Sequence, residues 1–288
     1  MEYWLSNAYA KINLGLHILE KLPNGYHSIE TGFCFIEWAD RFEVKPANRM
    51  HVQLSDPSIP VDDTNLVVKA VQILQQEAGL RDEFEISVQK NIPVGAGLGG
   101  GSSDAALTLR MLNKIANLGL SDSDLVELGK QLGADVPFFI LNEAGMGTGL
   151  GTEIEPLPIQ PDAWIVTLFP DVFSSTVEAY QYCEPGTSEF SVRSVLLEED
   201  MDQWQYLLQN DLEPAVFPRI ELVGNLKDQF YDFGAQYAAM SGSGSSVYGI
   251  FEQDFVALNA YDSLHQLGFK ANLTRPLFKP DTGIYQKE

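Results

Sequence analysis

Apolar side chains alternate with polar ones along several stretches of the chain, and a period of two is typical of β-strands with one buried face. The longest such stretch, residues 3–20, places Ala10, Ile12, Leu14 and Leu16 on one side. Shorter apolar or alternating runs predict further strands at residues 33–38, 41–44, 50–54, 84–89, 164–169, 236–240, 247–251 and 270–275.

Helical spacing of apolar positions fills the intervals between these strands. It predicts helices at residues 64–77, 104–118, 121–132 and 254–267, and several more between residues 175 and 230. Asp63 or Thr64 is expected to cap the first helix, and Ser121-x-x-Asp124 predicts a capping box at the third.

Three prolines, at positions 156, 158 and 161, interrupt the pattern and predict a boundary near residue 155. We therefore expect two domains, residues 1–155 and 156–288. Strands alternate with helices in the second of them, which predicts an α+β sandwich of ferredoxin-like type.

Composition adds limits on class and location. Hydrophobic residues make up 45% of the 288 residues and charged residues 20%, as in ordinary globular proteins. No apolar run approaches the roughly 20 residues that span a membrane, and the first residues do not resemble a secretory signal. The two cysteines, Cys34 and Cys183, are far apart, which argues against a disulfide framework or zinc site and favours the cytoplasm.

The chain is strongly acidic, with 40 acidic and 18 basic residues and a net charge of −22. Such a surface repels nucleic acids and anionic membranes, so we expect neither as a partner. Cations near an anionic ligand would have to be placed individually.

The segment 92–106, IPVGAGLGGGSSDAA, has five glycines and two serines within nine residues and then runs into alanines that favour a helix. It contains G-x-G-x-x-G, but the preceding strand is half polar and Pro93 intervenes, so a Rossmann fold is disfavoured. A Walker loop would need a lysine that is absent here. We interpret the segment as a loop whose backbone N–H groups bind a phosphate at a helix N-terminus.

Two charged residues stand in apolar surroundings. Asp135 lies between Gly133-Ala134 and Val136-Pro137, and Lys11 interrupts an apolar alternation. A lysine close to a carboxylate keeps it ionised, so the two suit a catalytic pair. The alternatives from sequence alone are a turn-forming aspartate and an exposed lysine on an edge strand.

The glycine-rich segment resembles the phosphate loop of the GHMP kinases. Two further motifs of that superfamily stand in the expected order, AKINLGL at residues 10–16 and MSGSGSSVY at residues 240–248. NGYH at 24–27, DTNLV at 63–67 and LGADVP at 132–137 resemble the branch that phosphorylates a cytidine-diphosphate-linked polyol in non-mevalonate isoprenoid biosynthesis.

The resemblance implies a two-domain α+β fold, with an N-terminal domain like domain 2 of ribosomal protein S5 and a ferredoxin-like C-terminal domain. It implies ATP as cosubstrate, together with Mg²⁺, whose ligands stay unknown apart from Ser103 as a candidate. The residues that it assigns to ATP are Pro93, Val94, Gly95, Ala96, Gly97, Leu98, Gly99, Gly100, Gly101, Ser102 and Ser103.

The same resemblance gives Lys11 and Asp135 the catalytic roles and assigns Asn13, Tyr26, His27 and Tyr180 to the acceptor substrate. The expected partners are therefore two small molecules, ATP and the cytidine-linked polyol, bound by a monomer or homodimer. The alternatives are a GHMP kinase of mevalonate or homoserine type, a catalytically silent sensor of the same fold, and an RNA-binding module that the negative charge disfavours.

Overall fold

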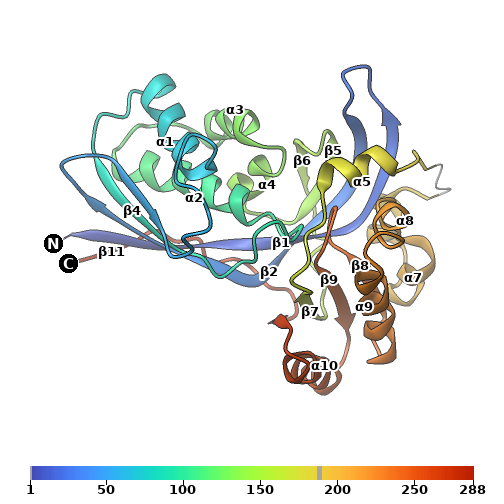
Figure 1. The fold of residues 1–288 in the computed structure, drawn as a ribbon. Coiled ribbons are helices and arrows are strands. Elements are labelled where there is room, and N and C mark those ends of the chain that lie inside the picture. Colours follow the sequence, from blue (N-terminus) through green and yellow to red (C-terminus); the bar gives the residue numbers. More distant parts are fainter. Residues whose placement is uncertain (1, 187–189) are drawn as a thin grey trace.

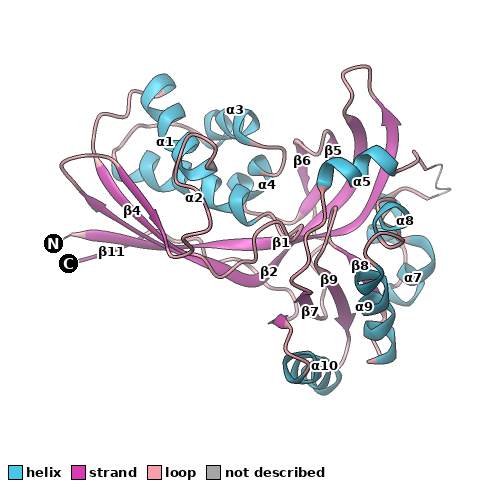
Figure 2. Ribbon diagram, viewed as in Figure 1, coloured by secondary structure: helices cyan, strands magenta, loops and turns pink. Residues whose placement is uncertain are grey.

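The computed structural model describes residues 2–186 and 190–288, which form two β-sheets with helices packed on both (Figures 1 and 2). The first sheet is built on a long antiparallel pair, β1 (Tyr3–Lys21) and β2 (His27–Pro46). The register of this pair shifts at three places along β1, and such bulges bend strands. Figure 1 shows the bend, which carries the far end of the hairpin toward the second half of the molecule.

β2 corrects one expectation, because residues 33–38 and 41–44 belong to a single continuous strand. The sheet order is β11-β1-β2-β4-β3. In addition, β5 pairs with β2, and β6 pairs with β5. The other strands are β3 (His51–Leu54), β4 (Phe84–Gln89), β5 (Gly145–Gly149), β6 (Glu153–Pro156) and β11 (Tyr285–Lys287).

Four helices cover one face of this sheet and bury the first apolar core against it (Figure 1). They are α1 (Leu66–Glu77), α2 (Gly100–Ile115), α3 (Asp122–Leu132) and α4 (Val136–Leu141). The capping box of α3 is confirmed, whereas α1 is capped by Asn65 rather than by Asp63 or Thr64. α2 begins at Gly100, four residues earlier than predicted, because glycine is a poor helix former and hid the first turn.

The second sheet has the order β10-β7-β9-β8, and its strand pairs are antiparallel. Its strands are β7 (Trp164–Phe169), β8 (Tyr237–Met240), β9 (Val247–Phe251) and β10 (Lys270–Thr274), and α9 (Glu221–Asp232) and α10 (Asp254–Gln266) pack on it. This order confirms the ferredoxin-like arrangement. The shorter helices are α5 (Thr176–Tyr182), α6 (Val192–Glu198), α7 (Trp204–Leu207) and α8 (Glu213–Val216), with a 3₁₀ turn, η1, at Met201–Gln203.

A second core joins the two sheets. Ile12 and Leu14 of β1 lie in one apolar cluster with Ile165 of β7 and Tyr248 of β9, and α6 and α7 contribute to it. The C-terminal strand β11 returns to pair with β1, so the two ends of the chain lie side by side (Figure 1). A division at residue 155 stays a prediction and does not account for this last strand. No helix in the described part of the chain is long and apolar enough to cross a membrane.

A buried charge cluster ties α2 to the first sheet. Lys90, just after β4, pairs with Asp40 of β2 and lies 2.5 Å from Asp104 of α2. Burial lowers the pKa of Lys90, but the two carboxylates outweigh it and raise that pKa, whereas burial raises the pKa of Asp104 well above its ordinary value. Asp40 also accepts the backbone N–H groups of Asn91 and Ile92, which fixes the start of the glycine-rich loop.

We expect Lys90→Met to lower the free energy of unfolding by about 3–5 kcal/mol, because it leaves two buried carboxylates without their cation. Lys45→Met is the matched control, since Lys45 also lies within 4 Å of two carboxylates, Glu43 and Glu85, but in solvent. Denaturant unfolding of both variants measures the difference. Equal losses would show that the Lys90 cluster does not hold α2 to the sheet.

Candidate active site

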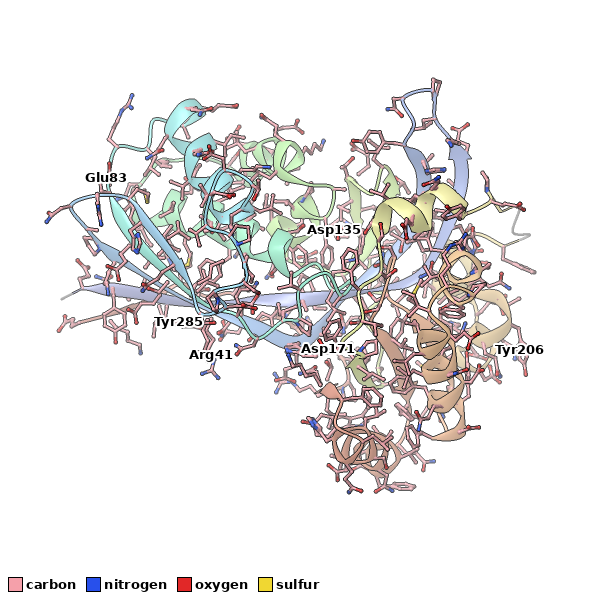
Figure 3. All side chains as sticks on the ribbon, viewed as in Figure 1. Arg41, Glu83, Asp135, Asp171, Tyr206 and Tyr285 are labelled. Atoms are coloured by element: carbon pink, nitrogen blue, oxygen red, sulfur yellow. The ribbon has the colours of Figure 1, made fainter. Side chains whose placement is uncertain are left out.

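A cleft of about 1060 Å³ lies between the two halves of the molecule. It is lined from β1, the β1–β2 turn, the glycine-rich loop, the α3–α4 turn, α5 and the loop between β8 and β9. Figure 3 shows Asp135 in this region, between the N-terminal helices and α5. The cleft brings together every residue that the sequence assigned to catalysis or to the acceptor: Lys11, Asn13, Tyr26, His27, Asp135 and Tyr180.

The carbonyl groups and the N–H groups of the glycine-rich loop, residues 93–99, differ in their hydrogen bonding. Its carbonyl groups are used internally: those of Ala96, Gly97 and Leu98 accept from Ser246 N–H, Ser241 Oγ and Lys11 N–H. By contrast, the backbone N–H groups from residue 94 to residue 102 have no acceptor within the described ranges. Free N–H groups at the N-terminus of a 16-residue helix, α2, form a site for an anion.

The loop also separates two cavities. A second cavity of about 430 Å³ lies on its other side and is lined by Leu54, Pro60, Leu66 and Lys90. The loop residues Gly95, Gly97, Gly99 and Ser102 line both cavities. An anionic group bound to the loop would therefore be accessible to ligands in both cavities.

Gly97 is the point where the loop meets the loop between β8 and β9, residues 241–246. Its φ is +75°, and a Cβ there would lie 2.1 Å from the carbonyl oxygen of Ser241. Ser241 Oγ donates to the Gly97 carbonyl at 2.9 Å. The Ser-Gly-rich segment 241–246 carries a role only through resemblance when the sequence is taken alone; in the structure Gly242, Ser243 and Gly244 line the cleft.

Lys11 and Asp135 form an ion pair, with Nζ and Oδ2 3.3 Å apart. The Lys11 side chain is 5% exposed and also donates to Asn13 Oδ1 at 2.6 Å, while the Asp135 side chain is 29% exposed. Asp135 precedes α4 but makes no capping hydrogen bond, so its carboxylate is free to face the cleft. Lys11 is therefore not an exposed lysine, and Asp135 does not act as a cap.

Aromatic rings gather at the other end of the cleft. The rings of His27 and Tyr180 are 5.3 Å apart and tilted by 31°, and Tyr26 stands beside them with 65% of its surface exposed. Gly25, with φ of +87°, forms the turn that presents Tyr26. Burial, and then the charge of Lys21, lower the pKa of His27, so its imidazole is neutral at pH 7 and both donates and accepts.

The lining of the cleft is less acidic than the chain as a whole, although one of its lysines, Lys130, is paired with Glu127 and Glu153. Among its lining residues are three lysines, Lys11, Lys21 and Lys130, and one acid, Asp135. This charge suits an anionic ligand.

Ser102 and Ser103 differ in their access to the cavities. Ser102 lines both, whereas Ser103 is buried and donates its hydroxyl to the Tyr9 carbonyl at 2.7 Å. Ser102 is thus the better placed of the two to contact a ligand. The described residues hold no group of three or more acidic, histidine or cysteine side chains that could bind a metal.

Comparison with known proteins gives consistent matches. The GHMP kinase N-terminal domain matches residues 65–143, and the GHMP kinase C-terminal domain matches residues 192–270. A relative from Chloroherpeton thalassium, 4-diphosphocytidyl-2-C-methyl-D-erythritol kinase, is 40% identical over 280 residues, which cover 95% of this chain and 98% of the relative. The protein of the same name from Bacteroides thetaiotaomicron is 41% identical over 85% of this chain and 91% of its own length.

Solved structures agree. The crystal structure of 4-(cytidine 5'-diphospho)-2C-methyl-D-erythritol kinase superposes with a TM-score of 0.78 at 31% identity, covering 95% of this chain and 98% of the other. Homoserine kinase from Cytophaga hutchinsonii gives a TM-score of 0.70 at 15% identity over 99% of this chain and 97% of its own, which shows a shared fold alone.

Gly97→Ala should destabilise the protein more than Gly119→Ala. Both glycines have φ of +75°, but a Cβ at Gly119 meets nothing within 4 Å, whereas one at Gly97 overlaps the Ser241 carbonyl. We expect an additional loss of about 1–3 kcal/mol in the free energy of unfolding at Gly97, the usual cost of overpacking. Chemical denaturation of the two variants measures this, and equal losses would mean that the two loops separate without cost.

Proposed function

Because the chain belongs to the family of 4-diphosphocytidyl-2-C-methyl-D-erythritol kinases within the GHMP kinases, we propose that it transfers the terminal phosphoryl group of ATP to the 2-hydroxyl group of 4-diphosphocytidyl-2-C-methyl-D-erythritol. This reaction is a step of non-mevalonate isoprenoid biosynthesis. The observation that carries the proposal is the Lys11–Asp135 pair in a cleft that shares the glycine-rich loop with a second cavity.

ATP binds with its phosphates on the loop and its base in the smaller cavity. Phosphoryl transfer requires mainly positioning and charge stabilisation from the protein. The N–H groups from residue 94 to residue 102 and the N-terminal end of α2 supply both for the phosphates. Because Gly95, Gly97, Gly99 and Ser102 border both cavities, the terminal phosphate reaches the acceptor in the larger cleft.

Asp135 accepts the hydrogen bond of the acceptor hydroxyl and takes its proton as that oxygen bonds to the terminal phosphorus and ADP leaves. Lys11, 3.3 Å from this carboxylate, donates to the oxygen on which negative charge develops. Asn13 fixes the direction of Lys11 through its Oδ1 atom and is itself held by a hydrogen bond from its Nδ2 to Thr31.

Mg²⁺ fits a site of this kind. It is usually bound by substrate phosphates and water with one or two protein oxygens, so a cage of carboxylates is not needed. Ser102 is the hydroxyl at the border of both cavities that would contribute such an oxygen. When bound, the ion would neutralise phosphate charge.

The cytidine end of the acceptor occupies the aromatic end of the cleft. Tyr26 and Tyr180 offer ring faces for stacking, and the neutral imidazole of His27 can pair with the edge of the base. A mevalonate- or homoserine-type acceptor has no base to place there, and this disfavours the alternative. The protein would work on small molecules in the cytoplasm, where its two free cysteines stay reduced.

The direct test offers the purified protein ATP together with the cytidine-diphosphate substrate, mevalonate or homoserine in parallel. We expect turnover of the cytidine substrate to exceed that of the other two by orders of magnitude, because a buried hydrogen-bonding site rejects acceptors that leave it unpaired. Preferred phosphorylation of mevalonate or homoserine would reject the proposed acceptor but keep the kinase chemistry.

Asp135→Asn should lower kcat at least about 10²-fold with little change in ATP affinity, because the neutral amide can accept a hydrogen bond from the hydroxyl but cannot take its proton. Asp122→Asn, on the first turn of α3, is the control and should retain wild-type turnover. Steady-state kinetics and calorimetric titration with ATP separate the two effects. Wild-type kcat in Asp135→Asn would remove this residue from the reaction.

Tyr26→Ala and His27→Ala should each raise KM for the cytidine substrate about tenfold or more. Loss of base stacking, or of a hydrogen bond in a buried site, costs about 1–3 kcal/mol. KM for ATP should stay within about twofold. Tyr206→Ala is the matched control, because Tyr206 is 67% exposed, close to the value for Tyr26, and lies away from Asp135 (Figure 3). If only KM for ATP changed, these residues would belong to the ATP site instead.

A further inference from the structure

The segment Asn210–Glu213, NDLE, lies outside the cleft but is bonded to both walls of it. The wall formed by β1 contributes the first set of contacts: Asp211 N–H donates to the Leu16 carbonyl at 2.8 Å, and Ile18 N–H donates to Asp211 Oδ2 at 2.8 Å. Leu16 N–H donates in turn to the Gln209 carbonyl at 2.8 Å. The segment is therefore fixed along the strand that carries Lys11 and Asn13.

The same segment forms hydrogen bonds with the end of β8 and with the loop that follows it. Asn210 Nδ2 donates to the carbonyl groups of Met240 at 2.9 Å and Gly242 at 2.8 Å. Glu213 Oε1 accepts from Met240 N–H at 2.9 Å, while its other oxygen lies 2.5 Å from Lys227 Nζ. Asn210 is 3% exposed and Glu213 is 7% exposed, so these bonds are shielded from water.

The loop between β8 and β9, which these bonds hold, lies close to Lys11 and Asn13. A Cβ at Gly242 would lie 3.1 Å from Asn13 Oδ1 and 3.8 Å from Lys11 Nζ, so the backbone there leaves little room beside the pair. Ser241 Oγ donates to the Gly97 carbonyl and lies 3.4 Å from Asn13 N. A shift of the loop would therefore alter the setting of Lys11 and of the glycine-rich loop together.

We propose that Asn210, with Asp211 and Glu213, is a positioning element for phosphoryl transfer, which holds the loop 241–244 against Lys11 and Asn13. This inference rests on the proposed kinase function. Asn210 does not line the cleft and touches no reacting atom, so its effect passes through the loop. A displacement of about 1 Å in a catalytic site can cost about 10²-fold in rate, even when the altered residue is remote.

The test is the kinetics of Asn210→Ala with Asn113→Ala as matched control. Asn113 makes a comparable pair of bonds, with Nδ2 donating to the Leu120 carbonyl and Oδ1 accepting Leu120 N–H, but neither residue lines the cleft. Both variants are assayed at a temperature where circular dichroism shows them folded. We expect kcat to fall at least about tenfold in Asn210→Ala and to stay within about twofold in Asn113→Ala.

Asn210→Asp adds a readout that a purely structural role would not move. The new carboxyl group keeps the shape but, when ionised, cannot donate to the Met240 and Gly242 carbonyls; when protonated it regains one donor. The ratio of its kcat to that of the wild type should therefore rise as the pH is lowered from about 8 to 6. A ratio independent of pH would contradict the proposal.

Glu213→Met covers the case in which the Asn210 variants do not fold, because methionine keeps the length of the side chain but removes the carboxylate oxygen that accepts from Met240 N–H. A loss of kcat of about threefold or more in the folded protein supports the positioning role, and wild-type kcat overturns it. An inactive wild-type protein in the same assay would instead count against the proposed acceptor reaction itself.

Discussion

The absence of a side chain at Gly97 is the constraint on which the site depends. The Ser241 carbonyl occupies the space that a Cβ would fill, and this contact joins a loop of the first sheet to a loop of the second. Where the two backbones meet, the carbonyl groups of Ala96, Gly97 and Leu98 accept hydrogen bonds, whereas the N–H groups from residue 94 to residue 102 have no acceptor among the described residues. The same contact brings Gly242 beside Lys11 and Asn13.

The charged residues that line the cleft differ from those of the chain as a whole. A chain with a net charge of −22 should repel both ATP and a diphosphate-linked acceptor, yet the lining of its cleft holds three lysines and one aspartate. Asp135 is only partly shielded and lies beside Lys11, so its carboxylate is neither isolated nor fully buried. The fully buried acids Asp40 and Asp104 share Lys90 instead, beneath the start of the glycine-rich loop.

Local pattern predicted most of the elements and failed where glycine or distance intervened. Strand β4 and the capping box of α3 follow from alternation and from Ser121 and Asp124, because both signals lie within a few residues. The first turn of α2 and strand β5 were missed because their glycines lack the apolar side chains that mark an element. Strand β11 was missed because its partner, β1, lies more than 260 residues away.

Local sequence also predicted only part of the candidate site. The sequence singled out Lys11 and Asp135 as charges out of place, and the structure places them 3.3 Å apart, but no periodicity could have paired residues so far apart in the chain. Asn210 gave no signal at all, since an asparagine next to an acid resembles any polar turn. Its importance comes from two carbonyl groups some 30 residues away, Met240 and Gly242, which have meaning only after the sheets have met. Residues that bind substrate can be inferred from their chemistry, whereas residues that hold the binding loops in place become visible only through the hydrogen bonds of the folded chain.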